Sequence, residues 1–177
     1  DHAGRYAVGG ATALTLLNML SPNYAQAQQV SFNDPDIVAD YITYPSPNGT
    51  GDVRGYLVRP AGVETPLPAV LVIHENRGLM ALAPDGLTSV GGYPGNDADG
   101  RELQRTVDST ELMNDFFAGF EHLLTREDST GKVGAVGFCY GGGVVNALAV
   151  AYPEMSAGVP FYGRQASVAD VPKIKAP

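Results

Sequence analysis

Several residue types are scarce in this 177-residue chain, and each scarcity excludes a class of structure or function. Cys139 is the only cysteine, so no internal disulfide can form. Lysine and arginine number 11 against 19 aspartates and glutamates, and the net charge of -8 disfavours binding to nucleic acid or anionic lipid. Only 17% of the residues are charged and 44% are hydrophobic, which argues against a disordered chain. We therefore expect one globular domain with an apolar core.

The N-terminal residues have the parts of a secretory leader. Residues 6–20 (YAVGGATALTLLNML) carry no charge, follow Arg5 and precede an A-x-A site at residues 25–27. This pattern predicts a signal peptide over residues 1–27 and a mature domain over residues 28–177, in the periplasm or outside the cell. The alternative is an amphipathic helix that lies on the domain of a cytoplasmic protein. The apolar stretch is shorter than the ~20 residues that a stable membrane span needs.

An antiparallel hairpin is predicted where the hydrophobic pattern alternates on both sides of a turn. Residues 41–44 and 53–58 show this alternation around Asn48-Gly49. The prolines near the turn suit a strand at the edge of a sheet.

Two parallel strands are predicted after the hairpin. Residues 69–73 (AVLVI) form a continuous apolar run, which is typical of a strand buried on both faces of a parallel sheet, and residues 81–84 resemble the end of a second such strand. A parallel crossover needs a dozen or more residues and usually a helix, but only residues 74–80 lie between these runs. Either the two strands are not parallel neighbours, or the chain lacks one crossover helix.

The remaining residues alternate between helix and strand. Residues 86–100 are rich in glycine, proline, asparagine and aspartate and predict a long surface loop. The sequence Asp108-Ser-Thr-Glu111 resembles a capping box, and the helix that follows has an apolar stripe that faces the core. The stripe contains Leu112, Met113, Phe116, Phe117, Phe120, Leu123 and Leu124.

Two further strands and a helix complete the pattern. Strands are predicted over residues 132–138 and 157–162, on either side of a helix over residues 144–152. This alternation predicts an α/β fold with a mostly parallel sheet and an antiparallel N-terminal hairpin.

The sequence GFCYGGG at residues 137–143 carries the strongest chemical signal. It lies between a predicted strand and a predicted helix, which is the context of a G-x-nucleophile-x-G elbow, with Cys139 in the place of serine. Gly137 and Gly141 suit the elbow because a side chain at either position would clash with a neighbouring element. The helix N-terminus behind the sulfur favours a thiolate. Cys139 is therefore predicted as a nucleophile; the alternative is a buried cysteine in a glycine-rich turn.

Together, GFCYGGG, VIHENRGL and ALAPDGL resemble the dienelactone hydrolase family of α/β-hydrolases, over about residues 41–177. The resemblance implies an α/β-hydrolase fold that cleaves a small-molecule ester or lactone, with Cys139 as the nucleophile. It also implies that Glu75 contacts the resting thiol and that the N–H groups of Asn76 and Tyr140 form the oxyanion hole. Glu75 follows a buried strand, so it lies at the edge where open α/β sheets bind ligands. A merely structural ion pair between Glu75 and Arg77 is the alternative.

The chain departs from the family pattern in its base and in its substrate-binding arginine. The family takes its catalytic aspartate and histidine from elements beyond residue 177, so the domain is expected to be truncated at the C-terminus. The family arginine that binds the substrate carboxylate has no counterpart in residues 86–89, and Arg77 and Arg164 are candidate replacements. The histidines present, none of which fits the catalytic base, are His2, His74 and His122.

Neither a metal nor an organic cofactor is implied by any motif. A zinc motif that began at His74 would need histidine where Gly78 stands. Two other functions remain as alternatives to ester hydrolysis: a catalytically incomplete fragment that acts as a binding or dimerising module, and a redox-sensitive thiol at Cys139. The sequence does not indicate an oligomeric state.

Overall fold

A computed structural model describes residues 31, 33–73 and 82–177 of the chain. The chain divides into two units, Asp1–Asp34 and Pro35–Pro177, and the second holds all of the described helices and strands. The leader expected over residues 1–27 lies outside the described residues, so export and the boundary at residue 28 stay predictions. No helix in the described ranges is both long and apolar enough to cross a membrane.

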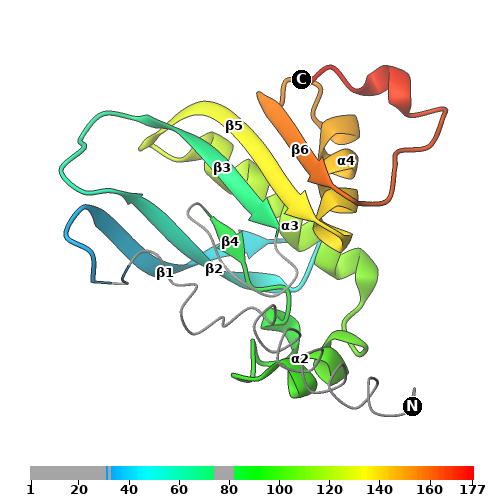
Figure 1. Ribbon diagram of the computed structural model, residues 1–177, viewed down its shortest axis with the longest axis horizontal. Helices are drawn as coiled ribbons and strands as arrows, with labels where there is room; N and C mark the ends of the chain where they lie inside the picture. Colours follow the sequence, from blue (N-terminus) through cyan, green and yellow to red (C-terminus); the bar gives the residue numbers. More distant parts are fainter. Residues whose placement is uncertain (1–30, 32, 74–81) are drawn as a thin grey trace, which may run out of the picture. The chain divides into compact units, whose positions relative to one another are not determined.

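The N-terminal hairpin consists of β1 (Ile37–Ser46) and β2 (Gly51–Pro60), and it confirms the predicted antiparallel pair (Figure 1). The two strands pair along their whole length, and the Gly49 N–H donates to the Ser46 carbonyl (3.0 Å) to close the turn. β1 is the edge strand of its sheet, as its prolines suggested.

The second sheet is parallel and contains β3 (Leu67–Ile73), β5 (Ser129–Phe138) and β6 (Ala157–Phe161), in the order β3-β5-β6. The short strand β4 (Ala83–Pro84) pairs antiparallel with β2, and Leu82, just before it, forms a parallel bridge with Leu71 of β3. β4 therefore joins the two sheets, and the predicted combination of a parallel sheet with an antiparallel hairpin is confirmed.

The hydrogen bonds between β3 and the start of β4 show whether these two strands are parallel neighbours. The Val72 N–H donates to the Leu82 carbonyl (2.9 Å), and the Leu82 N–H donates to the Val70 carbonyl (3.2 Å), so the strands are parallel neighbours. Residues 74–81, which lie outside the described ranges, are too few for a crossover of a dozen residues or more. The fold thus agrees with the expectation that one crossover helix is lacking.

Three α-helices and two 3-10 turns lie in the described residues of this unit. They are η2 (Thr88–Val90), α2 (Asp97–Gln104), α3 (Ser109–Thr125), α4 (Tyr140–Ala151) and η3 (Val171–Lys173). The start of α3 confirms the predicted cap, because the Asp108 carboxylate accepts the N–H groups of Thr110 (2.8 Å) and Glu111 (3.0 Å).

Two helix starts differ from the sequence prediction, and β5 begins at Ser129 rather than at Lys132. The surface loop expected over residues 86–100 contains the start of α2, because the Asn96 side chain accepts the Asp99 N–H (3.0 Å) and caps a helix there. α4 begins at Tyr140 rather than at Val144, so the glycines after the cysteine are helical instead of forming a longer turn.

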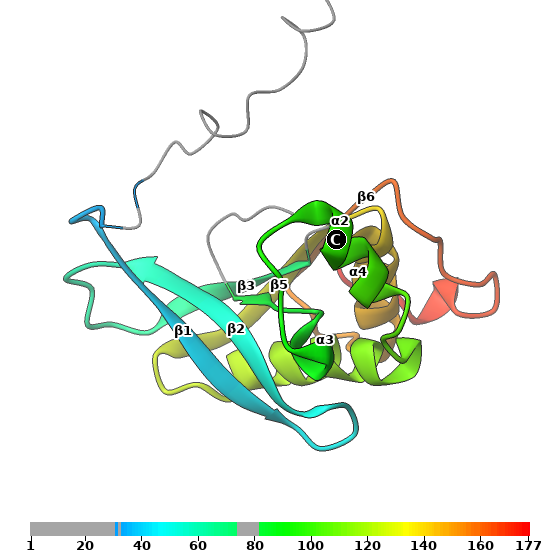
Figure 2. The same cartoon turned by 90° about the horizontal axis from the view of Figure 1, so that it is seen from below.

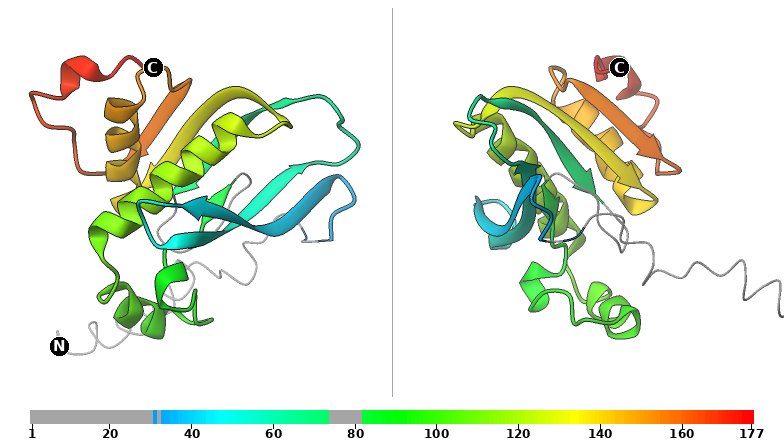
Figure 3. Two further views of the ribbon diagram at one scale, coloured as in Figure 1. Left: turned by 180° about the vertical axis from the view of Figure 1, so that it is seen from behind. Right: turned by 60° about the vertical axis from the view of Figure 1, so that its left-hand side comes forward.

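The core lies between the parallel sheet and the helices α3 and α4, which cover the same face of β3, β5 and β6 (Figures 1 and 3). The predicted stripe of α3 faces this core. On the other face, where no described helix packs, Val70, Val159 and Phe161 are 42%, 45% and 44% exposed. The prediction that β3 is buried on both faces was therefore wrong for Val70. Leu71, Val72 and Ile73 are buried.

A buried carboxylate ties the hairpin to α3, which runs beside it (Figure 2). Asp115 is only 4% exposed and accepts the N–H of Thr50 (2.9 Å) and its hydroxyl (2.8 Å). The Tyr44 hydroxyl donates to the Asp115 carbonyl (2.9 Å) from the adjacent strand. Burial raises the pKa of Tyr44, and the charge of Asp115 raises it further, so the phenol stays a proton donor.

The surroundings of His122 predict that the free energy of unfolding falls as the pH becomes acidic. Its ring stacks on Tyr44 with centroids 5.5 Å apart, and its Nε2 lies 3.3 Å from a nitrogen of Arg126. Burial and then the Arg126 charge lower the pKa of His122 below 6.5, while Asp128 acts in the opposite direction. The unfolded state therefore binds the proton first as the pH falls below about 6.5, and stability is lost from there downward.

We expect this loss to be smaller in His122→Gln, which cannot titrate. Urea unfolding at about pH 7.5 and about pH 5.5 measures it in both proteins. An equal loss of unfolding free energy in the variant would show that other groups cause the acid dependence.

Candidate active site

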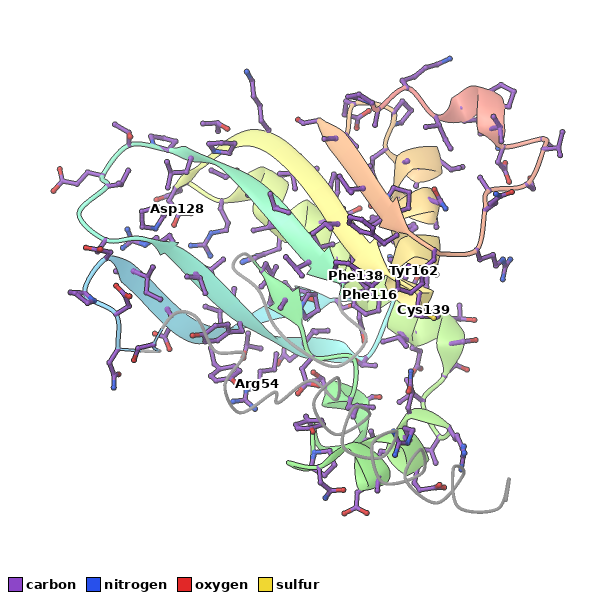
Figure 4. The ribbon with its side chains drawn as sticks, viewed as in Figure 1. Arg54, Phe116, Asp128, Phe138, Cys139 and Tyr162 are labelled. Carbon is purple, nitrogen blue, oxygen red and sulfur yellow. The ribbon has the colours of Figure 1, made fainter. Side chains whose placement is uncertain are left out.

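Cys139 sits in a strained backbone conformation between β5 and α4. Its φ is 53° and its ψ is -112°, and it forms the N-cap position of α4. A residue other than glycine in such a conformation costs about 1–3 kcal/mol and persists only where the surrounding structure fixes it. The thiol is free and exposed at the carboxyl end of the parallel sheet (Figure 4).

The two glycines of the motif are required by close backbone contacts. A Cβ atom on Gly137 would overlap the backbone of Gly141, and a Cβ atom on Gly141 would overlap the carbonyl oxygen of Ile73. Ile73 is the last residue of β3, so the elbow packs directly against the end of that strand. The predicted reason for both glycines is confirmed.

A third close approach, to the end of β6, was not predicted from the sequence. The Cys139 N–H donates to the Phe161 carbonyl (3.0 Å). A Cβ atom on Gly142 would lie 2.6 Å from the same oxygen, and one on Gly163 would overlap Gly142. The run of three glycines, together with the glycine just after the last strand, is the signal that could have indicated it.

Aromatic side chains surround the elbow. Phe138 stacks on Phe161 with ring centroids 4.8 Å apart, and the ring of Tyr162 lies 6.3 Å from that of Phe138. Tyr162 is 73% exposed and, like the cysteine, has a positive φ (35°). Partial burial raises the pKa of Tyr140, so its phenol is uncharged near neutral pH. A substrate that approaches the thiol from this side would meet uncharged aromatic surface.

The remaining predicted site residues divide into two groups. Glu75, Asn76 and Arg77 lie outside the described residues, so their roles stay predictions. Arg164 is exposed, and its carbonyl accepts the side-chain amide of Asn146 (2.9 Å). This hydrogen bond holds the backbone of Arg164 against the middle of α4. A role of Arg164 in substrate binding stays a prediction.

No base is placed beside the thiol by the residues that the structure describes. His122 is the only histidine in the described ranges, and it contacts Tyr44 and Arg126 on the far part of α3. Within those ranges, no group of three or more histidine, cysteine, aspartate or glutamate side chains could hold a metal ion.

Residues 76–177 match the family model of the dienelactone hydrolase family. A putative hydrolase fragment of Escherichia coli, YghX, is 61% identical over 115 residues, which cover 56% of this chain and 98% of that relative. A putative carboxymethylenebutenolidase of Synechocystis is 28% identical over 151 residues, which cover 72% of this chain and 60% of that relative. The chain thus spans less than two thirds of the length of the cyanobacterial protein.

Both alignments contain more positions than the number of residues of this chain that they cover. The 115 positions aligned with the E. coli protein use 56% of 177 residues, about 99, so about 16 positions of the relative have no counterpart here. The 151 positions aligned with the Synechocystis protein use 72%, about 127 residues, which leaves about 24 without a counterpart.

Solved structures show the same fold. A dienelactone hydrolase-like promiscuous phosphotriesterase from metagenomic libraries superimposes with a TM-score of 0.61 at 22% identity, over 80% of this chain and 66% of that one. A putative dienelactone hydrolase of Klebsiella pneumoniae does so with a TM-score of 0.57 at 22% identity, over 80% and 70%. With the family model matching more than half of its residues, the chain belongs to the dienelactone hydrolase family and has the α/β-hydrolase fold.

Proposed function

We propose that the chain carries the nucleophile-bearing part of a hydrolase of carboxylic esters or lactones, with Cys139 as the nucleophile. The observation that carries the proposal is the strained backbone of Cys139, enclosed by Gly137 and Gly141. The ends of β3 and β6 both close on this turn, and such strain is concentrated at functional sites. Membership of the family, whose relatives include a putative carboxymethylenebutenolidase, supports the same chemistry.

The reaction proceeds through a covalent thioester. The thiolate sulfur bonds to the substrate carbonyl carbon, and the carbonyl electron pair moves onto oxygen. Collapse of this intermediate breaks the bond to the leaving oxygen, which takes up a proton and departs as the alcohol. Water then attacks the thioester, releases the acid and restores the Cys139 thiol. A lactone opens by the same steps, with its alcohol still attached to the acyl group.

Backbone donors stabilise the oxyanion. The Tyr140 N–H belongs to the first turn of α4, where N–H groups have no partner within the helix, and the helix dipole favours negative charge there. We assign the second donor to the Asn76 N–H and the contact with the resting thiol to Glu75. Both residues follow Ile73 closely in sequence, and Ile73 adjoins the elbow. Donors of this kind are worth about 3 kcal/mol each in the transition state.

The two half-reactions are expected to differ in rate. Acylation requires the thiolate and the oxyanion donors, whereas deacylation also requires a base that activates water. Because the described residues place no base beside Cys139, the acyl-enzyme should form faster than it is hydrolysed. Arg77 and Arg164 are the proposed contacts for a substrate carboxylate.

Burst kinetics with 4-nitrophenyl acetate tests the proposal. We expect release of 4-nitrophenolate that approaches one equivalent per chain, followed by slow turnover, and no burst in Cys139→Ala. Ser89→Ala, which removes an exposed hydroxyl in η2, is the matched control and should keep the full burst. A burst of equal size in Cys139→Ala would refute the assignment.

A further inference from the structure

Three aromatic rings form a corner beside the elbow. Phe138 and Phe161 are opposite each other in the β5–β6 ladder, and their rings are nearly parallel, with an interplanar angle of 6° and centroids 4.8 Å apart. The ring of Tyr162 stands at 57° to that of Phe138, with centroids 6.3 Å apart. We call Phe138, Phe161 and Tyr162 the aromatic corner. Cys139 directly follows Phe138 in sequence, and the corner lies at the same end of the parallel sheet as the thiol (Figure 4).

Tyr162 is held by backbone contacts with the elbow on both of its sides. The Phe161 carbonyl accepts the Cys139 N–H (3.0 Å), and a Cβ atom on Gly163 would overlap the backbone of Gly142. Within the described residues, only Tyr162 and Cys139 combine a side chain with a positive φ. This conformation costs free energy, and burial does not offset the cost, because the Tyr162 side chain is largely exposed. Strain of this kind is concentrated at ligand contacts, so Tyr162 is a candidate for contact with the substrate.

The fourth ring at the elbow is directed toward a different element. The ring of Tyr140 lies 6.4 Å from that of Phe116, a buried residue of α3, and is tilted against it by 52°. The aromatic faces that a ligand of the thiol can reach on the β6 side therefore belong to Phe161 and Tyr162, both of which are exposed.

The acyl group of the substrate is the group that this corner can contact during the whole reaction. It is bonded to the Cys139 sulfur in the thioester and stays there until water releases it, whereas the alcohol departs after the first step. A planar ring can stack on Tyr162 or meet it edge to face, which are the arrangements that aromatic pairs prefer. Residues 137–143 and 157–163, which meet at the elbow, contain no charged side chain, so they offer no ion pair to a charged acyl group.

We propose that the preferred substrates are esters whose acyl group carries an aromatic ring, and that Tyr162 determines this preference. The proposal rests on the assignment of Cys139 as the nucleophile and specifies the substrate class of that site. The ring contact is separate from the carboxylate contacts proposed for Arg77 and Arg164.

Two esters with the same leaving group and different acyl rings test the proposal. 4-Nitrophenyl phenylacetate and 4-nitrophenyl cyclohexylacetate contain the same number of carbon atoms, but only the first has a planar aromatic ring. The acylation rate constant of each ester with the full chain is divided by its rate constant with N-acetylcysteine at the same pH, which removes the difference in intrinsic reactivity. We expect the normalised ratio to favour the phenylacetate by about 3- to 10-fold.

Substitutions at Tyr162 locate the origin of the preference. Tyr162→Leu should bring the normalised ratio close to one, and Tyr162→Phe should preserve it, because the face of the ring and not the hydroxyl makes the contact. Tyr41→Leu, which removes an exposed tyrosine of the N-terminal hairpin, is the matched control and should leave the ratio unchanged. A merely structural role of Tyr162 would slow both esters equally and would not move the ratio.

The outcomes separate this proposal from the proposed function. A normalised ratio close to one in the unchanged chain, with the burst intact, would overturn the aromatic preference and leave Cys139 as the nucleophile. The same ratio in Tyr162→Leu as in the unchanged chain would overturn the role of Tyr162. Absence of a burst with both esters would instead overturn the proposed function, and this proposal with it.

Discussion

Gly141→Ala is expected to lower the free energy of unfolding by about 2–4 kcal/mol and to abolish acylation at Cys139. The added Cβ atom would overlap the carbonyl oxygen of Ile73, a buried residue at the end of β3 whose backbone cannot rotate away. Relief requires α4 and β3 to separate, and this separation would also release the strained conformation of Cys139. Urea unfolding measures the first effect, and the 4-nitrophenolate burst measures the second.

Gly143→Ala is the matched control, since it adds the same atom one half-turn further along α4. There the Cβ atom would lie 3.3 Å from the Cβ atom of Arg164, a contact that a shift of a few tenths of an ångström relieves. Alanine also favours helix over glycine by about 1 kcal/mol, so the change in stability should be close to zero or positive. Equal destabilisation by both substitutions would contradict the specific role given to the Gly141–Ile73 contact.

Asp115→Ala is expected to cost about 2–4 kcal/mol of stability, the second largest effect. The substitution removes the carboxylate that accepts two hydrogen bonds from Thr50. The backbone N–H and the hydroxyl of Thr50 then lose this acceptor. The turn between β1 and β2 would then lose its attachment to α3. Thermal or urea unfolding measures the loss.

Asn114→Ala tests whether this cost is specific to the buried carboxylate. The Asn114 side chain also reaches the hairpin turn, by donating to the Asn48 carbonyl, but this bond is exposed to solvent. We expect a loss of about 0.5–1 kcal/mol, because water replaces the amide. A similar loss for both variants would contradict the importance of burial at Asp115.

Features with a local physical cause could be predicted from the sequence. The elbow follows from the steric demands on Gly137 and Gly141, and the start of α3 follows from the carboxylate of Asp108. The hairpin follows from alternation around Asn48-Gly49, since strand pairing across a short turn involves neighbours in sequence.

Features that depend on distant segments could not be predicted in the same way. The need for glycine at Gly142 and Gly163 arises from the approach of β6 to α4, and no local pattern specifies it. The exposure of Val70 depends on what covers the outer face of the sheet, and the apolar run in β3 is the same whether or not a helix packs there. Of the candidate site, the structure describes Cys139 and Tyr140 and not their proposed partners Glu75 and Asn76.

The position of the acyl group after brief exposure to 4-nitrophenyl acetate is the most direct test of Cys139 as the nucleophile. Proteolysis followed by mass spectrometry locates it. We expect one acetyl group per chain, on the peptide that contains Cys139, and none on the corresponding peptides of Cys139→Ala and Gly141→Ala. Acetylation spread over lysines with the Cys139 thiol unmodified would contradict the assignment of Cys139 as the nucleophile.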